Sequence, residues 1–113
     1  MVNFALQFEG NPYVYGGTSL TNGADCSGFV MSVFANFGYS LPRVAAAQCD
    51  ASTKKDISQL EPGDLVFYGS GYVDHVALYI GDGKIIHASG AATGIKISNY
   101  DYEQPAAVGT FME

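Results

Sequence analysis

Cys26 and the two histidines are the side chains of this 113-residue sequence that are best suited to nucleophilic chemistry. Cys26 stands between Asp25 and Ser27, directly after a polar, glycine-containing loop. A thiolate nucleophile needs a base, and the base needs a third polar group that fixes its ring orientation. His75 and His87 are the only histidines in the chain. These residue types predict a cysteine hydrolase in which Cys26 attacks, His75 takes the proton and His87 orients His75.

Other uses of the same residues stay open at this level. An isolated cysteine is more often a small buried residue than a nucleophile, and an isolated histidine on a strand is commonly a hydrogen-bonded surface group. The two histidines could instead bind a metal ion with Asp64, Asp74 or Cys26, although none of the familiar zinc spacings is present. Ser27 is a further candidate nucleophile, which we rank below Cys26.

A buried helix is predicted to carry Cys26 in its first turn. Apolar residues recur at helical spacing from about Ser27 to Phe37, and Gly38 is a natural stop. Asp25 is a favoured N-cap residue, because its side chain accepts hydrogen bonds from the first backbone N–H groups. The free N–H groups and the helix dipole favour an anion at this end, so we expect a lowered pKa for the Cys26 thiol.

Two strands, His75–Ile80 and Lys84–Ala88, are predicted to form a hairpin around the glycine-containing turn at residues 81–83. His75 opens the first strand and His87 lies near the end of the second. Counted from the turn, the two histidines are roughly opposite each other. Opposite residues of an antiparallel pair share a face, with Cβ atoms about 4.5 to 5.5 Å apart. The predicted register therefore brings the base and its orienting partner together.

The remaining pattern predicts an α+β fold, with N-terminal helices packed on a roughly five-stranded antiparallel sheet. The other expected elements are a short helix ending near Glu9, a second helix at Val44–Ala51, and strands at Leu65–Tyr68, Gly94–Ser98 and Ala107–Phe111. The strands are expected to follow the helices as a meander. We predict one catalytic domain over residues 1–113, and the sequence leaves open that this domain is excised from a longer exported protein.

The composition argues against several classes of function. A net charge of -6 and the lack of a basic stripe argue against a nucleic-acid partner. The longest apolar run in the core, Val76–Ile80, is too short to cross a bilayer, and the N-terminus lacks the pattern of a secretion signal. Cys49 lies in an alanine-rich segment and is expected to be a free structural residue rather than bridged to Cys26. No metal or cofactor is implied, and we expect a monomer.

Six motifs, in order along the chain, resemble the NlpC-type bacterial cell-wall cysteine endopeptidases, a papain-like family. These motifs are Pro12-Tyr13-Val14-Tyr15-Gly16-Gly17, Asp25-Cys26-Ser27-Gly28-Phe29-Val30, Leu41-Pro42-Arg43 with Gln48, Pro62-Gly63-Asp64-Leu65-Val66-Phe67, His75-Val76-Ala77-Leu78-Tyr79-Ile80-Gly81 and Ile86-His87-Ala88. The resemblance extends from about Asn3 to Phe111. It implies Cys26 as nucleophile, His75 as base and His87 as the third polar residue, which agrees with the register argument.

The same resemblance implies roles for four further residues. Tyr15 would lie beside the catalytic centre, where its hydroxyl would help the Cys26 backbone N–H to hold an oxyanion. Asp25 and Ser27 would hold the free amine of a stem peptide, as in those relatives that require one, while N-capping alone is the simpler role for Asp25. Arg43 would either contact a substrate carboxylate or anchor a loop.

A peptidoglycan endopeptidase, acting in the cell wall or outside the cell, is the function that the resemblance implies. The scissile bond would join γ-D-glutamyl or D-isoglutamine to diaminopimelate or L-lysine in a stem peptide, through a Cys-His-His triad. Two rival classes stay open: another Cys-His amidase or acyltransferase, and a catalytically silent wall-binding module. The presence of Cys26, His75 and His87 together argues against the silent module.

Overall fold

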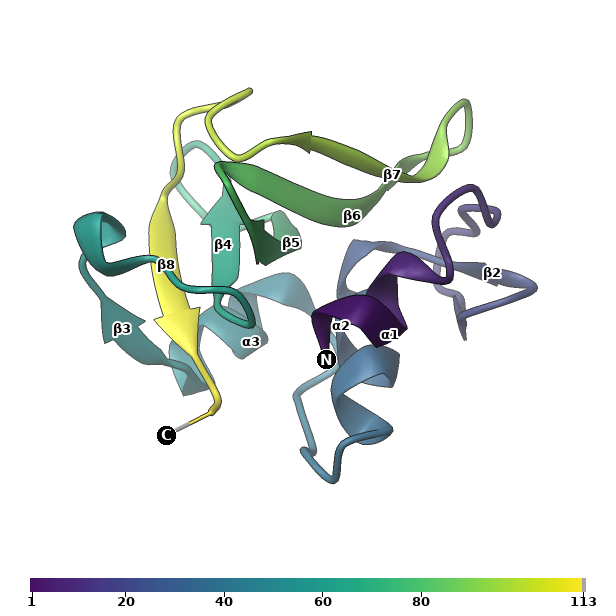
Figure 1. The fold of residues 1–113 in the computed structure, drawn as a ribbon, viewed down its shortest axis with the longest axis horizontal. Helices are drawn as coiled ribbons and strands as arrows, with labels where there is room; N and C mark the ends of the chain where they lie inside the picture. The colour runs from purple at the N-terminus through teal and green to yellow at the C-terminus, as the bar shows by residue number, and fades with distance from the viewer. Residues whose placement is uncertain (113) are drawn as a thin grey trace.

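The computed structural model describes residues 1–112, and its helices lie against one face of an antiparallel sheet (Figure 1). The helices are α1 (Val2–Leu6), α2 (Cys26–Ala35) and α3 (Ala45–Ala51), with a 3-10 turn, η1, at Ile57–Gln59. The strands are β1 (Thr18–Ser19), β2 (Gly23–Ala24), β3 (Thr53–Lys55), β4 (Leu65–Tyr68), β5 (His75–Gly81), β6 (Lys84–Gly90), β7 (Gly94–Asn99) and β8 (Ala107–Thr110). The predicted α+β class is confirmed.

The main sheet has six strands in the order β3-β8-β4-β5-β6-β7, where about five were expected. The strands β4 to β7 form the predicted meander, but β8 does not continue it. Instead, β8 returns to the other side of β4 and pairs with both β4 and β3. The strand β3 was not predicted, because its residues are polar and its pairing depends on a strand more than fifty residues away in the chain.

Apolar side chains cover both faces of the sheet, and α2 packs on one of them. The residues that face the helices pack with α2 in the main core, and they include Phe67, Val76, Leu78, Ile86 and Ile95. A smaller cluster covers the other face and includes Val66, Tyr68, Ala77 and Ile85. Because side chains alternate along a strand, His75 and His87 belong to this second face.

The helix α2 is held as predicted at both ends. Asp25 is its N-cap and accepts a hydrogen bond from the Gly28 backbone N–H at 2.8 Å. At the other end, Gly38 adopts a positive φ of 86°, and the Tyr39 N–H bonds back to the Phe34 carbonyl. The regular helix stops at Ala35, two residues before the expected end, because the Phe37 and Gly38 N–H groups bond to the carbonyl three residues back instead of four.

The N-terminal helix is shorter than expected, ending at Leu6 rather than near Glu9. The chain that follows is hydrogen-bonded to strand β7. The Gly10 N–H donates to the Ile95 carbonyl at 2.8 Å, and the Ile95 N–H donates to the Asn11 carbonyl at 3.0 Å. These bonds to β7 compete with further helical turns. The loop after them is also more regular than expected, since β1 and β2 pair within it.

The hairpin β5-β6 has the predicted strands but a different register. Asp82 and Gly83 form the turn, and both have positive φ, of 55° and 75°. Leu78 pairs with Ile86, so that extending this register places Ala77, rather than His75, opposite His87. The predicted register was therefore wrong by two residues. The histidines still share a face because a shift of two preserves the alternation of side chains.

Both cysteines are free, and Cys49 is 6% exposed, which confirms the expectation of a buried, unbridged residue. Within residues 1–112, none of the helices combines the length and the apolar character needed to span a membrane.

Candidate active site

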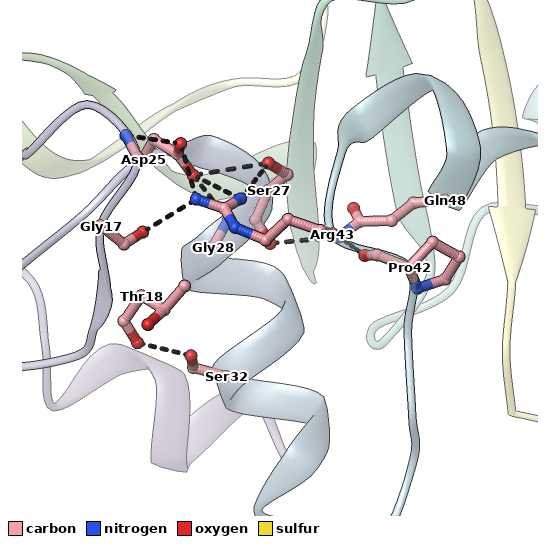
Figure 2. A network of polar contacts seen from close by, with 10 residues as sticks. Gly17, Thr18, Asp25, Ser27, Gly28, Ser32, Pro42, Arg43 and Gln48 are labelled. Atoms are coloured by element: carbon pink, nitrogen blue, oxygen red, sulfur yellow. Dashed lines mark hydrogen bonds and ion pairs between the residues drawn. The ribbon is translucent and has the colours of Figure 1, made fainter.

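Cys26 is the first residue of α2, and a network of hydrogen bonds around Asp25 holds this end of the helix in place (Figure 2). The two carboxylate oxygens of Asp25 accept from the backbone N–H groups of Gly16, at 3.0 Å, and Gly28, at 2.8 Å. Gly28 has no room for a side chain, because a Cβ there would lie 2.1 Å from the Gly17 carbonyl oxygen. The loop that contains Gly16 and Gly17 (the glycine loop) therefore packs against the first turn of α2 as one unit.

Arg43 clamps the same carboxylate from the segment before α3. Its two terminal nitrogens donate to the two Asp25 oxygens at 3.1 and 3.0 Å, and one of them also donates to the Ser27 hydroxyl at 3.0 Å (Figure 2). Burial alone would raise the pKa of Asp25, but the hydrogen bonds from Arg43, Gly28 and Gly16 outweigh it and lower that pKa. Asp25 is thus ionised near pH 7, and its two oxygens already accept hydrogen bonds from Arg43, Gly16 and Gly28.

Gln48 connects α3 to the first turn of α2 and is fully buried. Its side-chain nitrogen donates to the Ser27 carbonyl at 3.1 Å and to the Pro42 carbonyl at 2.8 Å (Figure 2). Its side-chain oxygen is the one buried polar side-chain atom without a hydrogen-bond partner among the described residues. Gln48 therefore anchors the start of α2 and the Pro42-Arg43 segment to each other from inside the core.

The Cys26 thiol does not have the lowered pKa that its place at a helix N-terminus predicts. Burial raises the pKa of Cys26, and the nearby negative charge of Asp25 raises it further. Hydrogen bonds from the backbone N–H groups of Val76, Ser27 and Cys26 itself act in the opposite direction but do not outweigh the burial. The prediction was wrong because desolvation of a buried thiolate exceeds the stabilisation that the helix end supplies.

The contact with Val76 connects Cys26 to the start of β5, directly after His75. In the described chain, the pairing of β5 with β6 begins only at Leu78, so His75–Ala77 pair with β4 alone. This splay of the two strands leaves the Val76 N–H free to reach the Cys26 sulfur. The N-terminus of α2 thus meets the sheet where β5 and β6 separate, beside the first histidine.

The two histidines are hydrogen-bonded to each other across this opening. His75 Nε2 and His87 Nδ1 lie 2.7 Å apart, with ring centroids 5.0 Å apart and planes at 71°. His87 Nε2 lies 2.9 Å from the Ser98 hydroxyl oxygen on β7. Burial lowers the pKa of His75, against a smaller opposing effect of the Asp74 carboxylate. The pair is therefore neutral near pH 7.

His87 is 1% exposed, and two tyrosine rings lie beside the histidine pair. The Tyr102 ring lies 5.4 Å from the His87 ring and 5.2 Å from the Tyr68 ring, which itself lies 5.9 Å from His75. Burial, together with the positive charges of His75 and Lys96, lowers the pKa of His87 to about 3. His87 is thus a neutral hydrogen-bonding group over the physiological range of pH.

A cleft of about 680 Å³ opens over Cys26. The glycine loop, the Arg43–Ala46 segment and residues 72–74 line it. Tyr15 lines this cleft as the resemblance implies, but it is 90% exposed. Tyr13, which the sequence analysis did not single out, lines it as well and is partly buried against the core. Burial raises the pKa of Tyr13, and the negative charge of Cys26, which lines the same cleft, adds to the effect.

The structure therefore places the Cys26 sulfur against the Val76 backbone, next in the chain to His75, which is hydrogen-bonded to His87. Asp25, Ser27 and Arg43 contact one another beside Cys26. Among residues 1–112, no group of three or more His, Cys, Asp or Glu side chains is arranged to hold a metal ion. Asp64, one of the alternative metal ligands, instead bonds to Lys55 at 2.7 Å and to the Glu61 N–H at 2.8 Å.

Comparison with known proteins gives matches over nearly the whole chain. The NlpC/P60 family model matches residues 10–110. The chain is 39% identical over 101 residues to a "Gamma-D-glutamyl-L-lysine dipeptidyl-peptidase" of Bacillus cereus, covering 86% of this chain and 30% of that protein. It is 45% identical over 110 residues to "Probable endopeptidase p60" of Listeria innocua, covering 96% of this chain and 22% of that protein. The chain thus spans less than a third of the length of these two relatives.

Solved structures agree with the fold. An NlpC/P60 family protein from Bacillus cereus superposes with a TM-score of 0.93 at 33% identity, over 99% of this chain and 39% of that chain. RipD of Mycobacterium tuberculosis, described as a non-catalytic NlpC/p60 domain protein adapted to peptidoglycan binding, superposes with a TM-score of 0.84 at 26% identity, over 98% of this chain and 95% of that chain.

Proposed function

Since the chain belongs to the NlpC/P60 family, with its α+β papain-like fold, we propose that it is a cysteine peptidase that hydrolyses stem peptides of peptidoglycan. The observation that carries the proposal is the 2.7 Å hydrogen bond between His75 and His87 beside the cleft that exposes Cys26. Cys26 would be the nucleophile, His75 the base and His87 its orienting partner. We also propose that residues 1–113 act as one catalytic domain and as a monomer, in the cell wall or outside the cell.

The site favours a neutral thiol and a neutral imidazole at rest, because burial raises the pKa of Cys26 and lowers that of His75. His75 Nε2 is occupied by His87, so the nitrogen that serves Cys26 is His75 Nδ1. On attack, the Cys26 proton moves to His75 Nδ1 while sulfur forms a bond to the amide carbonyl carbon. His75 then gives this proton to the leaving amine, and a water molecule hydrolyses the thioester to restore the thiol.

The developing oxyanion needs donors that are already in place before the attack. The Cys26 backbone N–H, at the start of α2, supplies one donor in this proposal. Tyr13 supplies the side-chain donor better than Tyr15, because it is partly buried and lines the cleft with Cys26, whereas Tyr15 is 90% exposed. A phenol whose pKa is raised stays protonated near pH 7 and can donate.

The bond proposed for cleavage joins γ-D-glutamyl or D-isoglutamine to diaminopimelate or L-lysine. The name of the Bacillus cereus relative supports it, since that protein is a γ-D-glutamyl-L-lysine dipeptidyl-peptidase. Arg43 is proposed to anchor the cleft rather than to bind a substrate carboxylate, because both of its terminal nitrogens already contact Asp25. Asp25 then acts mainly by capping α2 and ordering the glycine loop, and Ser27 by joining the same network.

Digestion of purified muropeptides, followed by mass spectrometry, tests the proposal. The wild type is expected to release products cut after γ-D-glutamyl, while Cys26→Ala releases none. Cys49→Ala is the matched control, since it removes the other thiol from the core without touching the cleft. Equal products from wild type and Cys26→Ala, or no products from either, would refute the peptidase. Binding to peptidoglycan without cleavage would instead favour a silent wall-binding module such as RipD.

A further inference from the structure

Ser98 is the last member of a chain of hydrogen bonds that begins at the proposed catalytic base. His75 Nε2 lies 2.7 Å from His87 Nδ1, and His87 Nε2 lies 2.9 Å from Ser98 Oγ. Ser98 is on β7 and pairs with Ile85 in the backbone register, so it reaches His87 diagonally across the sheet. The sequence analysis predicted a strand at this position but assigned no function to the serine.

The positions of the protons in this chain follow from the chemistry of the base. His75 Nδ1 must be unprotonated to take a proton from Cys26, so the single ring proton of neutral His75 lies on Nε2. That N–H donates to His87 Nδ1, which must also be bare. The proton of neutral His87 is therefore on Nε2, and its nearest acceptor is Ser98 Oγ.

The reverse arrangement is inactive. If Ser98 donated to His87 Nε2, His87 Nδ1 would carry the proton and donate to His75 Nε2. His75 would then hold its proton on Nδ1 and could not accept another from Cys26. When His75 becomes an imidazolium during the reaction, both of its nitrogens carry protons, and only the first arrangement satisfies all the donors.

We propose that Ser98 is a positioning residue that accepts the Nε2 proton of His87 and so keeps His75 Nδ1 available as the base. The inference rests on the proposed function for its catalytic meaning, although the direction of the hydrogen bonds can be observed without any substrate. Ser98 acts through His87 and does not touch the substrate.

The surroundings of His87 support a neutral acceptor at this point. The charged and titratable groups that face the two histidines are Lys96 on β7, Tyr68 on β4, Tyr102 in the β7-β8 connection and Asp74 before β5. Lys96 lies directly opposite His87 in the register and disfavours its protonation. Since His87 stays neutral, a hydroxyl can complete its hydrogen bonds, and no carboxylate is required.

Nuclear magnetic resonance of the 15N-labelled chain tests the direction of the bonds. Long-range 1H–15N spectra at pH 8 distinguish protonated from bare ring nitrogens, and the chain has only two histidines to assign. Wild type is expected to carry both ring protons on Nε2. In Ser98→Ala, His87 is expected to shift toward the Nδ1-protonated form, whereas Ser98→Thr, which keeps the hydroxyl, retains the wild-type form. Thr53→Val, on the opposite edge strand β3, removes a hydroxyl far from the site and serves as control.

Two activity measurements complete the test. The kcat/KM of Ser98→Ala on muropeptides is expected to fall roughly ten- to a hundred-fold, the effect of one buried donor without its acceptor, with rescue by Ser98→Thr. Alkylation of Cys26 by iodoacetamide is followed against pH by peptide mass spectrometry. The pH profile of its rate is expected to change in Ser98→Ala, whereas Ser98→Thr and the control keep the wild-type profile.

The outcomes separate this inference from the proposed function. A wild-type His87 that carries its proton on Nδ1 would overturn the inference. So would a Ser98→Ala variant that keeps the wild-type ring protonation and alkylation profile. If the ring protons are as expected but the wild type cleaves no muropeptide, the proposed function fails while the assigned direction of the hydrogen bonds is supported.

Discussion

Acidification should destabilise the fold through His87, and replacing this residue by asparagine should remove most of that effect. A histidine has an ordinary pKa of 6.5, and burial lowers the pKa of His87 to about 3 in the folded chain. Between these values the unfolded chain binds a proton that the folded chain does not, so stability falls as the pH falls below 6.5. From pH 7 to pH 5 this difference amounts to about 2 kcal/mol, at about 1.4 kcal/mol per proton and pH unit.

Urea unfolding at pH 5, 7 and 8.5, at constant ionic strength, measures this effect. The chain has no tryptophan, so circular dichroism and tyrosine fluorescence are the signals. In His87→Asn, the side-chain oxygen can still accept from His75, but no proton is taken up at this position. The variant is expected to lose about 2 kcal/mol less than wild type between pH 7 and pH 5, and the two proteins should respond alike from pH 7 to 8.5. Equal acid losses in both would refute the reasoning, including the burial of a neutral His87.

Three further predictions follow from single contacts and from the two shifted pKa values. Gly28→Ala places a Cβ 2.1 Å from a backbone carbonyl oxygen of the glycine loop, so we expect a loss of about 2 kcal/mol in urea unfolding and a large fall in kcat; an unchanged kcat would contradict this. Asp64→Ala removes a carboxylate that pairs with Lys55 at 2.7 Å and accepts from the Glu61 N–H, and should cost about 3 kcal/mol; a cost below about 1 kcal/mol would exclude a stabilising role for this carboxylate. The profile of kcat/KM against pH should have its acid limb below pH 6.5, because the pKa of His75 is lowered. Its alkaline limb should lie above pH 9.0, because the pKa of Cys26 is raised. An alkaline limb near pH 8 would instead indicate a resting ion pair between the Cys26 thiolate and the His75 imidazolium.

The sequence predicted which elements carry Cys26, His75 and His87 because these elements depend on local rules. Asp25 is an N-cap by residue type, and it fixes Cys26 at the start of α2. The period-two alternation of β5 and β6 placed His75 and His87 on one face, although the register was off by two. His75 and His87 are centred on residue 81, whereas the observed pairs Leu78–Ile86 and Tyr79–Ile85 are centred on residue 82.

Features that depend on contacts distant in the chain were beyond the sequence analysis. The pairing of β3 and β8 joins a polar strand that was not predicted to a predicted strand that was expected to continue the meander. The clamp of Arg43 on Asp25 spans eighteen residues, and composition alone left anchoring and substrate binding equally open. The pKa of Cys26 depends on how deeply the helix end is buried against β5, which only the assembled structure reveals.

The burial of the proposed base and nucleophile also explains why both are neutral at rest. A site of this kind needs no preformed ion pair, because the proton moves when the substrate carbonyl arrives and the oxyanion donors take up the charge. In this arrangement Tyr13 interacts electrostatically with the Cys26 sulfur, and the Tyr102 ring shields His87.

Trapping the covalent intermediate on Cys26 tests the central claim most directly. Wild type is mixed with a stem tripeptide, quenched in acid within its first turnovers, and examined by intact and peptide mass spectrometry. The proposal predicts a thioester that adds the acyl fragment ending in γ-D-glutamyl to the peptide containing Cys26, and no adduct in Cys26→Ala. An adduct on Cys49 or Ser27, or product formation from wild type and Cys26→Ala alike, would contradict it.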